Sequence, residues 1–425
     1  AAAPCAAEAL SPAEQRLVEQ IDARIDPALE LLERTVNVNS GTMNFAGVRE
    51  VGRLFAGEFE ALGFATRWVE GAAFQRAGHL VATRAGDGPR VVLIGHLDTV
   101  FEPDSPFQRY ERLSDTTARG PGVIDMKGGN VVMLEALRAL AAVGALDRLH
   151  VTAVLHGDEE KSGDPLTAAR ADLRAAAEGA LAAIGFEDGD GDPSTAVIAR
   201  RGSSGWRLEV TGKPAHSSQI FRDEFGAGAI FEAARILDGF RQGLAGERDL
   251  TFNPGVILGG TEVELDSEQD RGVAFGKSNV IAERAVVEGD LRAVTPEQLE
   301  RARAVMRQVA AASLPQTRAA LTFDDGYPPM GASDGNRRLL ALYDQASRDL
   351  GFGPVAAVDP RRAGAADVSF VAGLVEMALD GIGLMGDDGH TVDETADLTT
   401  LPSQAKRAAL LLYRLATRPE LAAGG

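Results

Sequence analysis

Apolar residues recur at helical spacing near the start of the chain. Residues 10–36 read LSPAEQRLVEQIDARIDPALELLERTV, in which apolar positions return at intervals of three and four. Ser11, Pro12 and Glu14 add a capping-box spacing with proline at the first helical position, which predicts that a helix begins here. A second amphipathic helix is expected over residues 47–62.

Short apolar runs rich in β-branched residues follow, and then alternate with helical segments. Strands are predicted at residues 79–86, 90–100, 148–160 and 180–190, with helices at 130–144 and 165–179. This alternation predicts an α/β fold, a mostly parallel mixed sheet covered by helices. Ligands of such sheets bind beyond the carboxyl ends of the strands, where the segments GHLD, HGDEE and GFEDGD stand.

The pattern changes near residue 203. GWRLEVTGKPAHSS is a two-sided strand pattern, followed by a helix at about 224–243, strands near 250–258 and 278–292, and a helix opened by Thr295-Pro296. We expect residues 202–316 to form an inserted α+β lid or dimerisation domain, with hinges near 202 and 316. Residues 1–201 and 317–425 then form the two parts of a catalytic domain that ends in a helix over 401–416.

Composition narrows the classes of partner. A formal net charge of −19 argues against nucleic acid and anionic membrane surfaces as binding partners. The sequence contains no run of eighteen apolar residues, so it does not predict a membrane span. The single cysteine, Cys5, excludes an internal disulfide framework and cysteine-rich zinc sites, so any metal must bind carboxylates and histidines. The first ten residues resemble the tract after a signal-peptide cleavage site, which predicts an exported protein and leaves a cytoplasmic one open.

Two segments supply candidate ligands of a metal. In GHLDTV, His96 and Asp98 stand two apart, so on a strand both side chains face the same way and the carboxylate can fix the tautomer of the histidine. In ARGPGVIDMKGGN, Asp125 lies in a glycine-rich turn before a helix. A phosphate-binding loop is disfavoured there, because the segment lacks the spacing and the Lys-Ser/Thr ending of such loops.

The adjacent acids Glu159 and Glu160 need a cation or a proton to offset their repulsion. A solvated helix N-terminus would explain DEEKSG alone. Two divalent ions explain a larger set, because their charge suits five groups: His96, Asp125, Glu160, Glu187 and His390. The side chain of Glu159 points away from that of its neighbour and could then take a proton from a metal-bound water. His79, His150 and His156 look like ordinary strand residues, and the sequence names no partner for them.

The ordered motifs GHLDTV, GPGVIDMKGGN, HGDEEKSG, GFED, VTGKPAHSS, GDLRA and DGHTVDE resemble a di-zinc metallopeptidase family. That family contains glutamate carboxypeptidase, acetylornithine deacetylase, succinyl-diaminopimelate desuccinylase and aminoacylase, and the resemblance spans about residues 15–415. It implies two zinc ions per chain, for which cobalt or manganese can substitute, and a zinc-activated hydroxide. The implied roles are His96 and Glu187 on one zinc, Glu160 and His390 on the other, Asp125 bridging, Asp98 supporting His96, and Glu159 as general base.

The resemblance also bears on substrate and assembly. Glu187, where aminopeptidase relatives carry Asp, favours a carboxypeptidase that cleaves an amide bond next to a free α-carboxylate of a small peptide or N-acyl-amino acid. An N-acyl-amino-acid deacylase, a dipeptidase and an inert binding relative are the alternatives. His216 matches a histidine that polarises the scissile carbonyl in a neighbouring subunit, which implies a homodimer through the inserted domain. Arg292 matches an arginine that grips the substrate carboxylate, and Asn279 is a further candidate for the carbonyl.

Two departures from the family pattern leave the substrate open. Many relatives have Asp-Asp at the bridging position, often with a cis peptide after it, whereas this chain has Asp125-Met126. The carboxypeptidases follow their metal-binding Glu with Pro, whereas Asp188 follows Glu187 here. Downstream, Arg200 and Arg201 either face an acidic substrate or stabilise a strand end.

Overall fold

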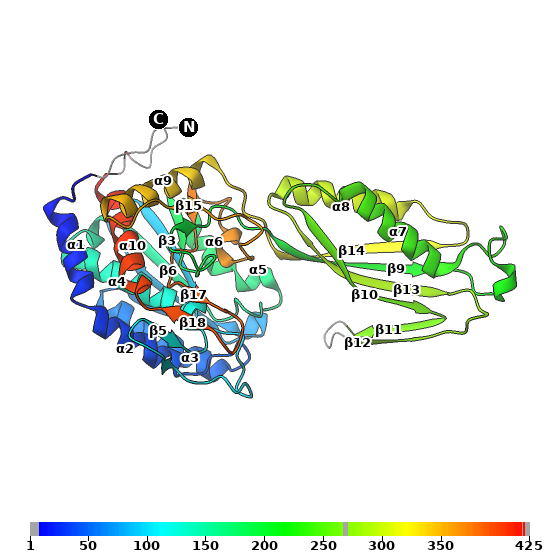
Figure 1. Cartoon of the computed structure of the whole chain (residues 1–425), viewed down its shortest axis with the longest axis horizontal. Helices are drawn as coiled ribbons and strands as arrows, with labels where there is room; N and C mark the ends of the chain where they lie inside the picture. The colour runs from blue at the N-terminus through cyan, green and yellow to red at the C-terminus, as the bar shows by residue number, and fades with distance from the viewer. Residues whose placement is uncertain (1–7, 267–270, 419, 421–425) are drawn as a thin grey trace. The chain divides into compact units, whose positions relative to one another are not determined.

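The computed structural model describes residues 8–266, 271–418 and 420, so Cys5 and most of the tract behind the predicted export lie outside the described residues. The chain divides into two compact units (Figure 1). Residues 1–199 and 332–425 form the first, here called the main unit, and residues 200–331 form the inserted unit. None of the helices in the described ranges combines the length and apolar character that a membrane span needs.

The main unit is built on a six-stranded mixed sheet. Its strands, in spatial order, are β1 (Ala65–Glu70), β2 (Gly78–Arg84), β6 (His150–His156), β3 (Arg90–His96), β7 (Ala182–Gly185) and β16 (Met377–Leu379). The last four run parallel, and β2 is antiparallel to both of its neighbours, β1 and β6. The predicted mostly parallel mixed sheet is therefore confirmed.

Helices cover this sheet. They are α1 (Pro12–Asp22), α2 (Ile25–Val36), α3 (Phe45–Ala61), α4 (Gly129–Ala142), α5 (Leu166–Ala169), α6 (Ala171–Ala177), α9 (Asp334–Asp349) and α10 (Thr400–Thr417). The predicted capping box opens α1, where Ser11 Oγ accepts from Glu14 N and Ser11 N donates to Glu14 Oε2. α4 is apolar and buried almost all round because it packs against α1 and α10 as well as the sheet.

A small sheet joins two distant parts of the main unit. Its spatial order is β17 (Gly386–Asp387), β18 (Thr395–Asp397), β5 (Thr117–Arg119) and β4 (Glu111–Arg112). The pairing of β18 with β5 brings the loop at residues 388–394 beside the turn that follows β5. A pair of short parallel strands, β8 (Thr195–Ala196) and β15 (Ala356–Ala357), lies elsewhere in the unit.

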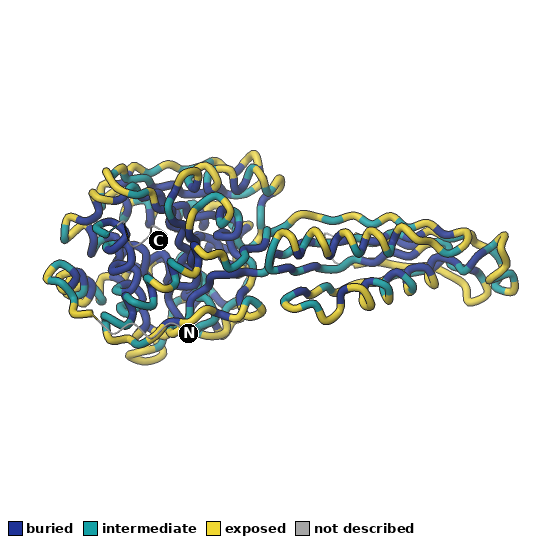
Figure 2. The backbone as a smooth tube through the Cα atoms, turned by 90° about the horizontal axis from the view of Figure 1, so that it is seen from above, coloured by how far each residue is buried: buried dark blue, intermediate teal, exposed yellow. Residues whose placement is uncertain are grey.

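The inserted unit is an antiparallel sheet packed against two helices. The sheet order is β10 (Thr251–Gly260), β13 (Arg284–Arg292), β9 (Ser203–Thr211) and β14 (Arg318–Tyr327), and the helices are α7 (Gly228–Leu244) and α8 (Pro296–Ala311). Burial alternates along β9, where Trp206, Leu208 and Val210 enter a core of their own. Figure 2 shows the same contrast between buried and exposed backbone along the unit. The α+β architecture of this segment is as predicted.

The predicted second boundary, at residue 316, is wrong: the inserted unit ends at 331. The reason is β14, which pairs along the full length of β9, from Arg318 opposite Thr211 to Tyr327 opposite Ser203. This pairing joins residues more than a hundred positions apart and leaves no local mark in the sequence. The hairpin of β11 (Glu262–Asp266) and β12 (Arg271–Phe275) was also not predicted.

Candidate metal centre

Three neighbouring parallel strands carry three of the predicted ligands at one edge of the main sheet. β3 ends at His96, β6 leads through Gly157 and Asp158 to Glu159 and Glu160, and β7 leads to Glu187. Because β6, β3 and β7 are adjacent and parallel, their carboxyl ends meet at the same edge. The sheet itself thus brings these residues together.

Asp125 and His390 come from irregular backbone beside that edge. Asp125 lies in the tight turn Val123–Gly128, and the peptide bond between Asp125 and Met126 is cis. His390 lies in the loop between β17 and β18 and has a left-handed backbone, with φ 65°. The small sheet described above brings this loop to the Asp125 turn.

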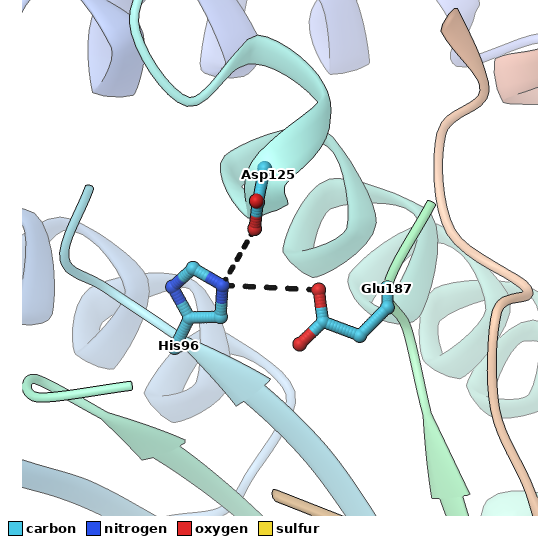
Figure 3. Close-up of side chains that lie close together, drawn as sticks. All are labelled: His96, Asp125 and Glu187. Atoms are coloured by element: carbon cyan, nitrogen blue, oxygen red, sulfur yellow. Dashed lines mark hydrogen bonds and ion pairs between the residues drawn. The ribbon is translucent and has the colours of Figure 1, made fainter. Parts of the chain in front are cut away.

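The five predicted ligands form two clusters that share Asp125. In the first, His96 Nε2 lies 2.9 Å from Asp125 Oδ1 and 3.8 Å from Glu187 Oε2 (Figure 3). In the second, His390 Nε2 lies 2.8 Å from Asp125 Oδ2 and 3.1 Å from Glu160 Oε2. One ligand atom from each residue of a cluster lies within 4.8 Å of the others. We call His96 and Glu187 the strand half, and Glu160 and His390 the loop half.

Burial and charge shift the pKa values of the strand half and of Asp125. Burial opposes the charged form of His96, but the negative charge of Glu187 and hydrogen bonds to Asp125 and Asp98 outweigh it and raise its pKa well above the ordinary value. Burial raises the pKa of Glu187 well above its usual range. Burial likewise disfavours the Asp125 carboxylate, but hydrogen bonds from His390 and His96 outweigh this and lower its pKa.

The loop half shows the same crowding of acids. Burial, followed by the charge of Asp125, raises the pKa of Glu160 to about 7. Hydrogen bonds to Asp125 and Glu160 raise the pKa of His390 to about 11. Burial and then the charge of Asp367 raise the pKa of Glu159 well above its ordinary value. A divalent cation in each cluster would reverse these shifts in the acids by stabilising their charged forms.

The donor set fits such cations. Glu160 Oε1 is buried and has no hydrogen-bond partner among the residues that the structure describes. Each cluster offers two carboxylates and one imidazole, which suit zinc and also cobalt or manganese. The structure therefore places all five predicted ligands where two ions could bind them.

Asp98 connects both halves. Its Oδ1 accepts from Glu159 N at 3.1 Å, and its Oδ2 accepts from Glu160 N at 3.1 Å and from Thr42 Oγ1 at 2.7 Å. His96 Nδ1 lies 3.0 Å from the Asp98 carbonyl oxygen and 3.5 Å from its Oδ1. The predicted support of His96 thus comes mainly from the backbone carbonyl, while the carboxylate fixes the backbone of both glutamates.

A buried polar network behind Glu159 supplies partners for two histidines for which the sequence named none. His156 Nδ1 pairs with Asp367 Oδ2, and Arg170 donates to Asp367 Oδ1 at 2.7 Å and to Asp158 Oδ1 at 2.6 Å. His79 Nε2 lies 2.8 Å from the Ala169 carbonyl oxygen, and its Nδ1 accepts from Gly157 N. These contacts hold the segment that leads into Glu159. The sequence gives one sign of this network, which is that polar residues occur within an otherwise apolar strand.

The three substrate-contacting residues predicted in the inserted unit lie at two separate places. His216 and Asn279 are neighbours, because Ser217 N donates to the Asn279 carbonyl oxygen and His216 bridges to Val280. Both side chains are exposed and lie beyond the Arg284 end of β13. Arg292 lies at the other end of β13, where its Nε donates to Asp290 Oδ2 at 2.7 Å.

The two further arginines have different surroundings. Arg200 is buried, and its backbone pairs with that of Met330 at the edge of the inserted unit. Arg201 donates from Nη1 to Thr251 Oγ1 at 2.9 Å. Both contacts agree with the alternative in which these arginines stabilise a strand end.

An α/β sheet whose strand ends carry two clusters with one shared aspartate defines the class of two-metal hydrolases. The chain belongs to peptidase family M20/M25/M40, whose family model matches residues 92–417. The predicted family and the predicted metallopeptidase activity are therefore confirmed.

Individual relatives agree with this assignment. Carboxypeptidase G2 of Pseudomonas sp. (strain RS-16) is 25% identical over 394 residues, which cover 91% of this chain and 89% of that protein. The crystal structure of aminopeptidase PepT from Bacillus cereus superposes with a TM-score of 0.73 at 19% identity, covering 92% of this chain and 99% of that one. The YXEP protein of Bacillus subtilis, a dinuclear metal-binding M20 peptidase, gives 0.65 at 15% identity, covering 93% and 99%. The two solved structures show a shared fold.

Proposed function

We propose that this metallopeptidase is a zinc-dependent, carboxypeptidase-like exopeptidase that cleaves an amide bond next to a free α-carboxylate. The observation that carries the proposal is the pair of three-residue clusters sharing Asp125, with Glu159 next to the ligand Glu160. The choice of carboxypeptidase is supported by the 25% identity to carboxypeptidase G2 along 91% of the chain and by Glu187 in the place where aminopeptidases carry Asp.

His96, Asp125 and Glu187 would hold one ion, and Asp125, Glu160 and His390 the other. When bound, two zinc ions supply a Lewis acid for the scissile carbonyl and lower the pKa of a water molecule. The protein fixes the ligands beforehand: Asp98 orients His96, and Asp380 Oδ1 accepts from Glu187 N at 3.3 Å. The sheet edge and these hydrogen bonds therefore provide the geometry that the chemistry needs.

Glu159 is proposed as the general base that takes a proton from the attacking water and passes it to the leaving amine. Its position is set by the hydrogen bond from its backbone N–H to Asp98 Oδ1 and by the buried network below it. Burial raises its pKa in the metal-free chain, and two bound cations would lower it again, so that the carboxylate could accept a proton from the water.

The inserted unit is proposed to bind the substrate. Arg292 would pair with the substrate carboxylate, since a guanidinium binds a carboxylate by two parallel hydrogen bonds. His216 and Asn279 would stabilise the negative charge that develops on the carbonyl oxygen. His216 Nδ1 accepts from Ser218 N at 3.2 Å, so the neutral ring carries its proton on Nε2 and can donate it to that oxygen.

These roles require two copies of the chain. β13 has nine residues, and a strand rises about 3.3 Å per residue, so its ends lie roughly 26 Å apart. Arg292 and the pair His216 and Asn279 lie at opposite ends, which is too far for one small substrate to touch both in a single copy. A homodimer in which one copy supplies Arg292 and the other supplies His216 resolves this. Exposed apolar side chains on the inserted unit, Phe221, Ile230 and Phe231, support such a pairing.

A substrate panel tests the reaction class. Purified protein with restored zinc is given peptides ending in a free carboxylate, N-acyl-amino acids and dipeptides, together with the same compounds carrying an amidated C-terminus. The proposal predicts cleavage of the free acids and little cleavage of the amides. Preference for N-acetyl-amino acids or dipeptides would move the assignment to a deacylase or dipeptidase. Cleavage of free acid and amide at equal rates would contradict the role of the carboxylate.

Complementation tests the dimer. Glu159→Gln and His216→Ala are each expected to be nearly inactive, and they are mixed under conditions that allow subunit exchange. If His216 acts on the partner's site, each mixed dimer has one site with both groups intact, so about a quarter of wild-type activity returns. If His216 acts in its own chain, or if the protein is a monomer, no activity returns.

A further inference from the structure

Glu394 is a buried carboxylate that binds the backbone of the Asp125 turn. Its side chain is fully buried, with Oε2 accepting from Gly122 N at 3.0 Å and Oε1 accepting from Ile124 N at 2.9 Å and from Asp125 N at 3.3 Å. One side chain thus satisfies three backbone donors of the turn that carries the shared ligand. Burial raises the pKa of Glu394 to about 8, and the three backbone N–H groups oppose that shift by stabilising the carboxylate.

The turn is shaped so that these donors converge. Gly122 has a left-handed backbone, with φ 71°, and a Cβ there would lie 2.5 Å from Thr99 Cγ2. Successive N–H groups that point to one side of such a turn form an anion-binding concavity. Glu394 fills this concavity from a part of the chain 269 to 272 residues away.

Glu394 also closes the loop that carries His390. Glu394 N donates to the Thr391 carbonyl oxygen at 3.1 Å, and Thr391 N donates to the Asp388 carbonyl oxygen at 3.1 Å. The backbone of the two segments touches as well, since Gly120 N lies 3.4 Å from the Glu394 carbonyl oxygen. The same residue therefore belongs to the His390 loop and holds the Asp125 turn.

We propose that Glu394 is a positioning residue that sets the distance between the Asp125 turn and the His390 loop, and so determines the affinity of the loop half for its ion. His390 is the ligand that most needs this, because its side chain is 58% exposed and it lies on a loop rather than at the end of a strand of the main sheet. The strand half also uses Asp125, but it depends less on Glu394, because β3 and β7 carry its other two ligands, His96 and Glu187. The inference rests on the two-metal centre proposed above.

The test is a metal titration of Glu394→Gln. The amide has the same shape, but it places an NH₂ group against backbone N–H donors, so at least one of the three hydrogen bonds is lost. Apo protein is titrated with Co²⁺ and followed by absorbance and calorimetry, and the step that weakens in His390→Ala identifies the loop half. We expect that step to weaken about 10- to 100-fold, as for other residues that orient metal ligands, and the other step to weaken much less.

A matched control separates positioning from general stability. Glu14 is also a buried glutamate that accepts from a backbone N–H, that of Ser11, and it lies away from the metal centre at the start of α1. Glu14→Gln should lower the melting temperature and leave both binding steps as in the wild type. If Glu394→Gln does not fold, Glu394→Asp, which keeps the charge but is one methylene shorter, is titrated in its place with the same expected split.

The outcomes are distinguishable. Two unchanged binding steps in a folded Glu394 variant, or equal weakening of both steps, would overturn the proposal for Glu394 alone. Absence of any metal binding in the wild type would instead overturn the proposed function. If the loop-half step alone weakens, or weakens much more than the other step, the result supports the positioning role of Glu394. This conclusion does not depend on which substrate the enzyme prefers.

Discussion

The two halves of the metal centre use the same kinds of ligand but hold their histidines in opposite ways. His96 lies at the end of β3 with 1% of its side chain exposed, whereas His390 lies on a loop with 58% exposed. Both ligands of the strand half therefore come from the main sheet, whereas the loop half combines Glu160, which follows β6 of that sheet, with a histidine from a distant loop. We therefore expect the two sites to bind their ions with different affinities, because the strand half is held more rigidly than the loop half.

We expect the largest loss of metal binding and activity from a change at Asp125, the residue that both clusters share. Asp125→Ala removes the one ligand that both clusters share, so both ions should be lost. Activity should fall by more than about 10⁴-fold, since proton transfer and electrostatic stabilisation fail together. Metal analysis after dialysis and an assay on the best substrate measure both effects. Asp104→Ala, at an exposed position in the same unit, should keep both ions, and an Asp125→Ala protein with one tightly bound ion would break the idea of a shared ligand.

Glu159→Gln tests the chemistry without disturbing either half. Glu159 is not in either cluster, so the variant should retain about two ions while kcat falls roughly 10²- to 10⁴-fold, the usual contribution of a general base. Steady-state kinetics with parallel metal analysis give the result. Loss of an ion would show that Glu159 is a ligand, and an unchanged kcat would remove it from the mechanism.

The contrast between the two halves also explains which residues of the metal centre the sequence predicts and which it does not. His96, Glu160 and Glu187 follow from strand periodicity, because neighbouring parallel strands end at one edge. Asp125 and His390 entered the set of five ligands by a charge argument, but only the resemblance of ordered motifs assigned them to particular ions, since nothing local shows that a turn and a distant loop meet. The role of Glu394 was not predicted, although this residue ends the motif DGHTVDE. The reason is that the three backbone N–H groups that it binds lie about 270 residues earlier in the sequence. The same holds for Arg170 and Asp367, which are 197 positions apart.

Metal removal should distinguish the halves directly. On exposure to a chelator, the ion of the loop half should leave first, because its histidine is exposed and carried by a loop. His390→Ala should bind one ion per chain with near wild-type affinity and a second at least about 100-fold more weakly. The release is followed by a colorimetric metal indicator. Simultaneous release of both ions would mean that the halves do not differ as their burial suggests.

The smallest effect is a pH dependence of metal affinity. In the metal-free chain, hydrogen bonds to Asp125 and Glu160 raise the pKa of His390 to about 11, so below that pH the ring carries a proton that the ion must displace. The affinity of the loop half for its metal ion should therefore rise with pH, by about tenfold per pH unit for each proton that binding releases. Calorimetry at pH 6, 7 and 8 in buffers of different ionisation enthalpy counts those protons. Affinity that is constant over this range would contradict the protonated starting state.

The central claim is that one aspartate joins two ion sites of unequal rigidity, and anomalous diffraction tests it most directly. Crystals of zinc-loaded protein measured on both sides of the zinc absorption edge should show two peaks, one among His96, Asp125 and Glu187 and one among Asp125, Glu160 and His390. After a brief soak in chelator, the second peak should lose occupancy first. A single peak, peaks away from Asp125, or a strand-half peak that fades first would contradict the account.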